Sequence, residues 1–313
     1  MAKGLVSDTN LTAIANAIRT KNGSSDRYTP ATMAQAISDI PSGDTLVEVL
    51  ESRTSLRYAL AYSSITECPM FAVNSSVRDC SNMFSGCRQL TTIPQLDTSK
   101  VTNFGSTFSS CTQLTTIPQL NTSSGTSFNS TFHSCSNLTT VQLDTSKGTS
   151  FNSAFYGCSK LTTVQLDTSN ATNFGSMFYS CSRLTTIPQL NTSKGTNLSG
   201  MFAGCSNLTT IPQLNTSSGT SFAQMFNGCT LLTTIPQFDL ASASSATALQ
   251  DMFASCFYIS DTSLNNILAS LAYASVTANK TLKYIGLRSA QATTCTTLSN
   301  WAACQAAGWT TGY

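Results

Sequence analysis

Residues Phe174 to Leu190 read F-G-S-M-F-Y-S-C-S-R-L-T-T-I-P-Q-L and form the clearest copy of a unit that the chain repeats seven times. Each copy carries a Phe and, three residues later, a Cys. The Phe residues are Phe84, Phe108, Phe132, Phe155, Phe178, Phe202 and Phe226, and the Cys residues are Cys87, Cys111, Cys135, Cys158, Cys181, Cys205 and Cys229. Phe253 and Cys256 make a weaker eighth copy. A fixed period of 23 to 24 residues predicts a solenoid, in which each unit stacks on the next.

Each unit combines two hydrophobic periods. In its first half apolar residues recur at i, i+4 and i+7, as in Phe174, Phe178 and Cys181, which predicts one face of a short helix. Its second half reads L-T-T-V-Q-L at 138–143 and 161–166, which is the strand pattern of leucine-rich repeats. The expected fold is therefore an α/β, leucine-rich-repeat-like solenoid with one short strand and one short helix in each coil.

The other copies of the second half read L-T-T-I-P-Q-L and are one residue longer. Pro cannot donate to a strand ladder and is found at bulges and edges. We therefore expect a one-residue bulge at the prolines of the array, which are Pro94, Pro118, Pro188, Pro212 and Pro236.

The order M-F-x-x-C-x-x-L-T-x-I-P-x-L resembles the BspA-like leucine-rich repeats of bacterial surface proteins and phage tail proteins. The resemblance covers about half of the chain, and its motifs recur in a constant order. It implies a binding protein rather than an enzyme.

The regions outside the array differ from it. Residues 1–43 predict a small module of two helices, and their pattern resembles a module that opens many phage and prophage tail proteins. Because two short helices bury little by themselves, we expect this module to attach or oligomerise through its apolar stripes. Those stripes consist of Leu11, Ile14, Ile18, Met33, Ile37 and Ile40.

Two further regions flank the array, which we place at 84–256. Residues 44–83 should hold a strand at 45–50 and a capping repeat whose first coil begins near Ile65. Residues 257–313 should form a C-terminal α/β cap, with helices at 263–272 and 295–307 and a strand at 281–287. Trp301 and Trp309 are expected to cover the open end of the stack, because an uncapped solenoid would expose its core.

Composition excludes several classes of protein. Only 10% of the residues are charged and the formal net charge is +2, so the chain lacks the basic surface of a nucleic-acid-binding protein. It contains no run of 18 apolar residues, so no membrane-spanning helix is expected. Its N-terminus lacks the apolar segment of a signal peptide, which favours folding in a reducing cytosol. Most of the 12 cysteines belong to the repeat column, so their spacing reflects packing rather than a disulfide framework.

No constellation for catalysis, for a metal or for a cofactor emerges from the sequence. His133 is the single histidine, and the Cys column has one residue per coil and no C-x-x-C pair, unlike a zinc site. An Asp or Asn recurs in each coil and is followed by Thr-Ser in all but the last, at Asp239; this column suggests either a calcium ladder or, more simply, turns in which the side chain bonds its own backbone. The turn interpretation is favoured.

Residues that differ between near-identical copies point to the ligand site. The position after each repeated Phe and the position two residues after each repeated Cys vary most, so both should be exposed. Aromatic and Arg side chains dominate binding energy at interfaces. The candidate ligand-binding residues are His133, Tyr156, Lys160, Tyr179 and Arg183.

These observations favour a phage or prophage tail-fibre component that binds a host cell-surface glycan or protein. It would be assembled in the bacterial cytoplasm, belong to the virion and contact other tail proteins, and the resemblance to tail fibres implies a homotrimer. One alternative is a bacterial surface adhesin of the BspA-like type. Another is an ice- or surface-binding solenoid that uses the repeated Thr-Thr pairs; since adjacent strand residues point to opposite faces, one Thr column would be presented.

Overall fold

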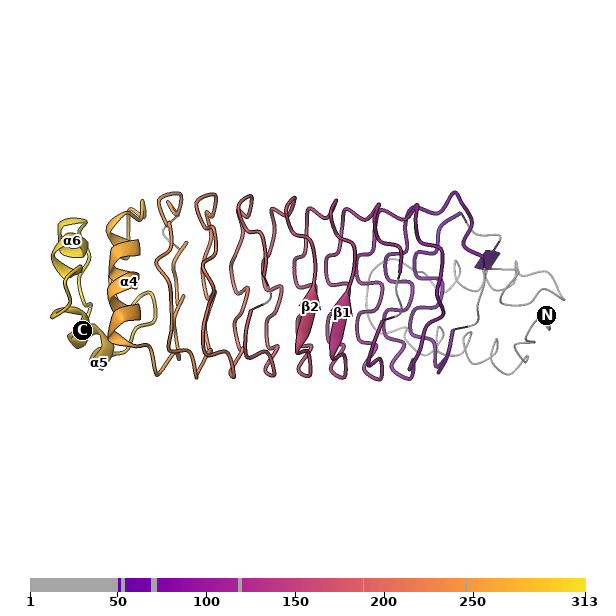
Figure 1. The fold of residues 1–313 in the computed structure, drawn as a ribbon, viewed down its shortest axis with the longest axis horizontal. Helices are drawn as coiled ribbons and strands as arrows, with labels where there is room; N and C mark the ends of the chain where they lie inside the picture. The colour runs from indigo at the N-terminus through magenta and orange to yellow at the C-terminus, as the bar shows by residue number, and fades with distance from the viewer. Residues whose placement is uncertain (1–49, 52–53, 69–71, 118–119, 188, 246) are drawn as a thin grey trace.

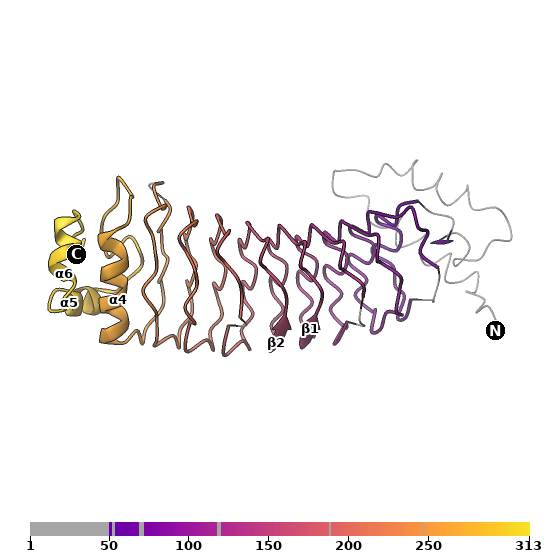
Figure 2. The same ribbon diagram turned by 45° about the horizontal axis from the view of Figure 1, so that its top comes forward.

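The computed structural model describes residues 50–51, 54–68, 72–117, 120–187, 189–245 and 247–313. They form an elongated stack of coils, each lying against the next in sequence (Figure 1). Three helices close its C-terminal end: α4 (Asp261–Ala272), α5 (Ser289–Cys295) and α6 (Trp301–Ala306). In Figure 2 the same helices lie together beyond the last coil, so the molecule is a one-dimensional array with a helical end.

Regular strand occupies only two coils of the described chain. β1 (Thr140–Gln142) and β2 (Thr163–Gln165) pair in parallel, with Val141 opposite Val164. Other described coils pair through isolated parallel bridges, such as Thr210 with Thr234. Both strands lie in the copies that lack Pro, as expected when Pro removes a ladder donor.

The expected bulges have no ladder in which to form. Around Pro94, Pro212 and Pro236 the described residues form bridges rather than continuous strands. Pro118 and Pro188 lie outside the described residues.

The helix predicted in the first half of each unit is wrong. From residue 174 to 181 the chain makes successive turns, in which the N–H of Met177 donates to the carbonyl of Phe174, three residues back, at 3.1 Å. Alternate N–H groups donate instead to the next coil: that of Phe178 reaches Met201 O at 2.8 Å. The turns also need left-handed backbone at Ser176 and Ser180, whose φ angles are +52° and +58°.

The spacing of the coils explains why a helix cannot form here. The rings of Phe155 and Phe178, in adjacent coils, have centroids 5.4 Å apart. An α-helix with its side chains is about 10–12 Å across, so one helix per coil would force the coils apart. The side-chain half of the prediction is confirmed, because Phe174, Phe178 and Cys181 are all fully buried.

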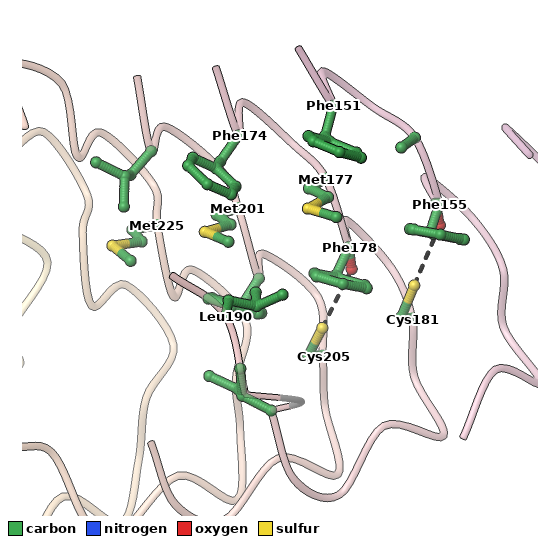
Figure 3. Close-up of a cluster of buried hydrophobic side chains, with 14 of the residues drawn as sticks. Phe151, Phe155, Phe174, Met177, Phe178, Cys181, Leu190, Met201, Cys205 and Met225 are labelled. Atoms are coloured by element: carbon green, nitrogen blue, oxygen red, sulfur yellow. Dashed lines mark hydrogen bonds between the residues drawn. The ribbon is translucent and has the colours of Figure 1, made fainter. Parts of the chain in front are cut away.

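Ladders of identical side chains fill the core (Figure 3). Neighbouring Phe rings stack nearly parallel, as at Phe178 and Phe202, whose centroids are 5.6 Å apart. Each repeated Cys is more than a small hydrophobe: Cys205 Sγ donates to the Phe178 carbonyl at 3.2 Å (dashed in Figure 3). Burial raises the pKa of the Cys205 thiol to about 12, so the thiol keeps the proton that it donates. No disulfide joins the repeated cysteines from Cys87 to Cys256.

Both residues of the Thr-Thr pairs reach solvent, contrary to the expectation of one presented column. Thr162 and Thr163 are both exposed. β2 begins at Thr163, so Thr162 precedes the alternation of the strand. The hydroxyl of Thr162 donates to Thr139 O at 3.2 Å, which ties it to the previous coil.

The stack begins earlier than predicted. Leu56 N–H donates to Asp79 O at 3.1 Å and Leu60 N–H to Met83 O at 2.9 Å, so residues ahead of Ile65 already form a coil. Leu50 is helical, so the end of the strand expected at 45–50 is wrong. Residues 1–43 and their candidate oligomerisation residues lie outside the described residues.

The C-terminal cap matches the prediction in part. α4 confirms the helix expected at 263–272. The strand expected at 281–287 is wrong: this segment makes the turns of one more coil, and Phe253 N–H donates to Ile285 O at 2.9 Å. The helix expected at 295–307 is also wrong, because α5 ends at its start and α6 covers only its second half. Trp309 is buried and its Nε1–H donates to Leu271 O at 3.0 Å, as expected of an end cover.

Candidate functional site

His133, Tyr156 and Tyr179 stack into a ladder on the surface of the array, which we call the surface aromatic ladder. The ring centroids of His133 and Tyr156 are 4.7 Å apart, and those of Tyr156 and Tyr179 are 4.5 Å apart. The planes are inclined by only 6° and 3°. Each ring directly follows a buried Phe of the core and is itself half-buried. The structure thus brings these three predicted residues into contact.

The stacking determines which part of each ring a ligand can reach. Both faces of Tyr156 are covered, one by His133 and the other by Tyr179. What remains accessible is the ring edge with its hydroxyl. At Tyr156 the ladder therefore presents a hydrogen-bonding edge rather than a flat aromatic face.

His133 is held in this row as a neutral side chain. Partial burial lowers the pKa of its imidazole below the usual value, so the ring is uncharged at neutral pH. Its Nδ1 lies 3.0 Å from the hydroxyl of Ser134. That contact fixes the orientation of the imidazole in the stack.

Lys160 and Arg183 occupy one column of adjacent coils, two residues after a repeated Cys, and both are exposed. Lys160 Nζ donates to Asn137 Oδ1 at 2.8 Å, and Asn137 Nδ2 donates to Thr112 O at 2.7 Å. Ser182 Oγ donates to Ser159 O at 3.4 Å, which keeps the two coils in register beside the cations. The structure shows no direct contact of either cation with the rings of the ladder.

The acidic side chains nearest in sequence to these cations lie at the opposite end of the strand segment. Asp144 and Asp167 follow the strands and make the predicted turns: Asp167 Oδ1, for example, accepts from Ser169 N–H at 2.8 Å. In the described chain no group of three or more His, Cys, Asp or Glu residues could hold a metal ion. The turn interpretation of this column is confirmed.

A groove that the sequence did not indicate lies on the same strand segments. It has a volume of about 600 Å³ and crosses several coils. Its lining includes Gln95, Leu120, Gln142, Leu143, Gln165 and Leu166. A second hollow of about 460 Å³ adjoins it, between β2 and Thr186. Both are lined by the copies that lack Pro together with neighbouring copies that have it, so the signal that could have found them is the change in length between these copies.

A family profile described as "Mycoplasma protein of unknown function, DUF285" matches residues 78–185 and 149–267, together more than half of the chain. The chain belongs to this family. The match covers the repeat array and supports the BspA-like leucine-rich-repeat character expected from the repeat unit. No helix of the DUF285 chain is long and apolar enough to cross a membrane, within the residues described.

Solved structures that resemble this DUF285 chain include one leucine-rich repeat protein and one internalin. A leucine-rich repeat protein from Bacteroides ovatus matches with 19% identity and a TM-score of 0.33, over 64% of this chain and 60% of that one. The chain thus matches less than two thirds of the length of that protein. An internalin from Listeria monocytogenes matches with 12% identity and a TM-score of 0.25, over 87% of this chain and 88% of that one. Among curated proteins there is no significant match.

Proposed function

We propose that this protein is a surface-recognition solenoid whose ligand contacts the surface aromatic ladder. The ladder carries the proposal. The repeated Phe and Cys columns of the core keep one residue type, whereas the ladder column holds His133, Tyr156 and Tyr179 in the middle coils and small or polar residues elsewhere. Within this column of the described array, only the middle coils carry rings of the kind that dominate interfaces.

The stack also lowers the cost of binding. A Tyr side chain that is free in solution loses rotamer freedom when a ligand immobilises it. Tyr156 is already held between two parallel rings, so most of its rotamer freedom is lost on folding rather than on ligand binding. Rigid amphipathic rings of this kind are well suited to contacts with polar surface polymers.

Two settings fit the same site. In the setting that we favour, the protein is a phage or prophage tail-fibre component, and residues 1–43 join it to the tail or to two sister chains. In the other it is an adhesin on a bacterial surface. Light scattering on the full chain and on a chain starting at Thr45 separates them: a trimer that becomes a monomer on truncation supports the tail fibre, and a monomer in both cases favours the adhesin.

The alternative function, an ice- or surface-binding solenoid that uses the Thr-Thr pairs, stays a prediction. Exposure of both Thr residues in a pair favours it, but hydroxyls such as that of Thr233 donate to a carbonyl of the previous coil, at 3.1 Å to Thr209 O. The proton of such a hydroxyl is already donated within the protein, so it is not available for a hydrogen bond to an external surface.

Binding to an array of immobilised bacterial surface glycans and proteins tests the ladder. The double variant Tyr156→Ser, Tyr179→Ala introduces residues that neighbouring coils carry at this position, Ser109 and Ala203, so the fold should be retained. We expect it to lose binding, and Tyr273→Ala, which removes a Tyr that is 71% exposed in the cap, to keep it. Equal binding by the ladder variant and the wild type would refute the proposed site.

A further inference from the structure

We propose that the ligand of the surface aromatic ladder is a polyanionic glycan, whose carboxylate or phosphate groups are bound by Lys160 and Arg183. This inference rests on the proposed function and names the chemical class of its ligand. It follows from the charges at this corner of the coils and from the part of the rings that is accessible.

The two cations form an uncompensated pair. Successive coils stack at about the strand spacing of 4.8 Å, so Lys160 and Arg183 project from neighbouring positions of one column. Within the residues described here, neither makes an ion pair, and the acidic residues Asp144 and Asp167 belong to turns at the other end of the strand segment. Both charges are thus open to an anionic ligand that runs along the solenoid axis and contacts successive coils.

Lys160 is also positioned rather than free. The Lys160 ammonium group donates to Asn137 Oδ1, and Asn137 Nδ2 in turn donates to the Thr112 carbonyl. The charge is therefore held over the coil that carries His133. A held cation loses less freedom on binding an anion than a mobile one does.

The rings favour a hydroxyl- and anion-rich ligand over a neutral sugar stacked on a ring face. Because both faces of Tyr156 are covered, its hydroxyl and that of Tyr179 are the groups left to donate hydrogen bonds. Hydrogen bonds to charged acceptors are shorter and stronger than those to neutral ones. The ladder and the cation column both run along the solenoid axis, so a linear polymer with repeated anionic groups can contact several coils at once.

The test compares binding of four probes to the full chain: oligogalacturonate, a phosphomannan, neutral dextran and a DNA oligonucleotide. We expect one of the two acidic glycans to bind, more weakly as salt rises, because screening acts on exposed charges. Oligogalacturonate binding would identify carboxylates as the recognised groups, and phosphomannan binding would identify phosphates.

The test variant and its control both replace exposed cations by Asn, and they differ in which corner of the coils loses the charge. Lys160→Asn with Arg183→Asn introduces the residue that Asn137 and Asn207 provide in the coils on either side. Lys194→Asn is the control, because Lys194 makes the same contact at the opposite corner, donating to Asn170 Oδ1 at 2.7 Å. We expect the double variant to bind the acidic glycan about tenfold or more weakly, since each lost charged hydrogen bond contributes on that order. The control should bind like the wild type.

The failure of this inference differs from that of the proposed function. Binding of dextran as tight as that of the acidic glycans, or binding unaffected by the double Asn variant, overturns the anionic ligand and leaves the ladder as a site for neutral glycans. Binding of DNA as tight as that of the acidic glycans overturns the assignment to a glycan. Absence of binding to these probes and to every component of the surface array overturns both.

Discussion

The array and the C-terminal cap carry the same hydrophobic spacing and fold it differently. Residues 174–181 and α4 both place apolar side chains at helical intervals. In the array the N–H of Phe178 donates to the next coil, whereas in α4 the N–H of Leu264 donates to Ser260 O, four residues back, at 2.8 Å. Helical spacing therefore reveals which side chains face the core, and the presence of a neighbouring coil decides which acceptors the backbone uses.

α4 can be a helix because it takes the place of the next strand. The segment 233–238 would otherwise end the stack with unpaired backbone groups. Ser263 Oγ accepts from Ile235 N–H at 2.9 Å, and Ser270 Oγ accepts from Phe238 N–H at 2.8 Å. Asn266 Nδ2 donates to Ile235 O at 2.9 Å. Side chains of one helix thus close the strand edge, which limits pairing with other chains.

The largest effect on stability is expected from the buried stack of Phe rings in the core of the array. Phe178→Ala removes a fully buried ring that stacks on Phe155 and Phe202, and should lower the free energy of unfolding by about 3–5 kcal/mol. Phe253→Ala, beside the cap, removes a ring that stacks on Phe226 with centroids 6.0 Å apart and should cost less. Urea unfolding of both variants measures the difference; an equal or larger cost at Phe253 would contradict it.

The edge contacts of α4 come next. Ser270→Ala leaves the buried N–H of Phe238 without its acceptor and should cost about 1–3 kcal/mol in urea unfolding. Thr262→Ala changes an exposed residue of the same helix and should stay within about 0.5 kcal/mol. If the two variants were equally stable, α4 would not depend on this contact.

Substitution by Gly should act in opposite directions in the two regions. Ser180 has φ at +58°, so Ser180→Gly relieves left-handed strain and should stabilise the array by about 0.5–1 kcal/mol. Ala269 lies inside α4, where Ala269→Gly should destabilise by about 1 kcal/mol. Thermal unfolding measures whether each variant is more or less stable than the wild type. Destabilisation by Ser180→Gly would instead indicate a helix in the array.

The smallest effect concerns the turns at the ends of the strands. The N–H of Ser169 bonds the carboxylate of Asp167 and lowers its pKa below the usual value. The stability that it contributes is therefore present above the unfolded-state pKa of about 3.9 and is lost as pH falls through the lower folded-state value. Since Asp167 is almost fully exposed, the contribution is small.

Asp167→Asn isolates this contribution, because Asn191 accepts the same turn bond from Ser193 N–H in the next coil, at 3.1 Å. The variant should match the wild type at pH 7 and lose less stability on acidification to pH 3. An acid response identical to that of the wild type would show that the turn is insensitive to this charge.

Much of the candidate site follows from comparing the copies of the unit. The position after each repeated Phe singled out His133, Tyr156 and Tyr179, and the structure stacks them. What the comparison could not provide is that the rings cover each other, because this depends on the distance between coils. The groove beside Gln142 and Gln165 was missed for a similar reason: the shorter copies were evident, but their effect on the surface depends on the longer coils next to them.

The sequence by itself determined the solenoid, its period and most of its core, because the buried Phe, Cys and Leu residues recur at a constant interval. It also determined the turns after the strands, since an Asp or Asn side chain bonds a backbone group only two residues away. The tertiary structure decided whether each segment became helix, strand or turn. The physical reason is that a backbone N–H in the array can donate either to a carbonyl of its own coil or to a carbonyl of a neighbouring coil. The neighbouring carbonyl is present only when the coils are stacked.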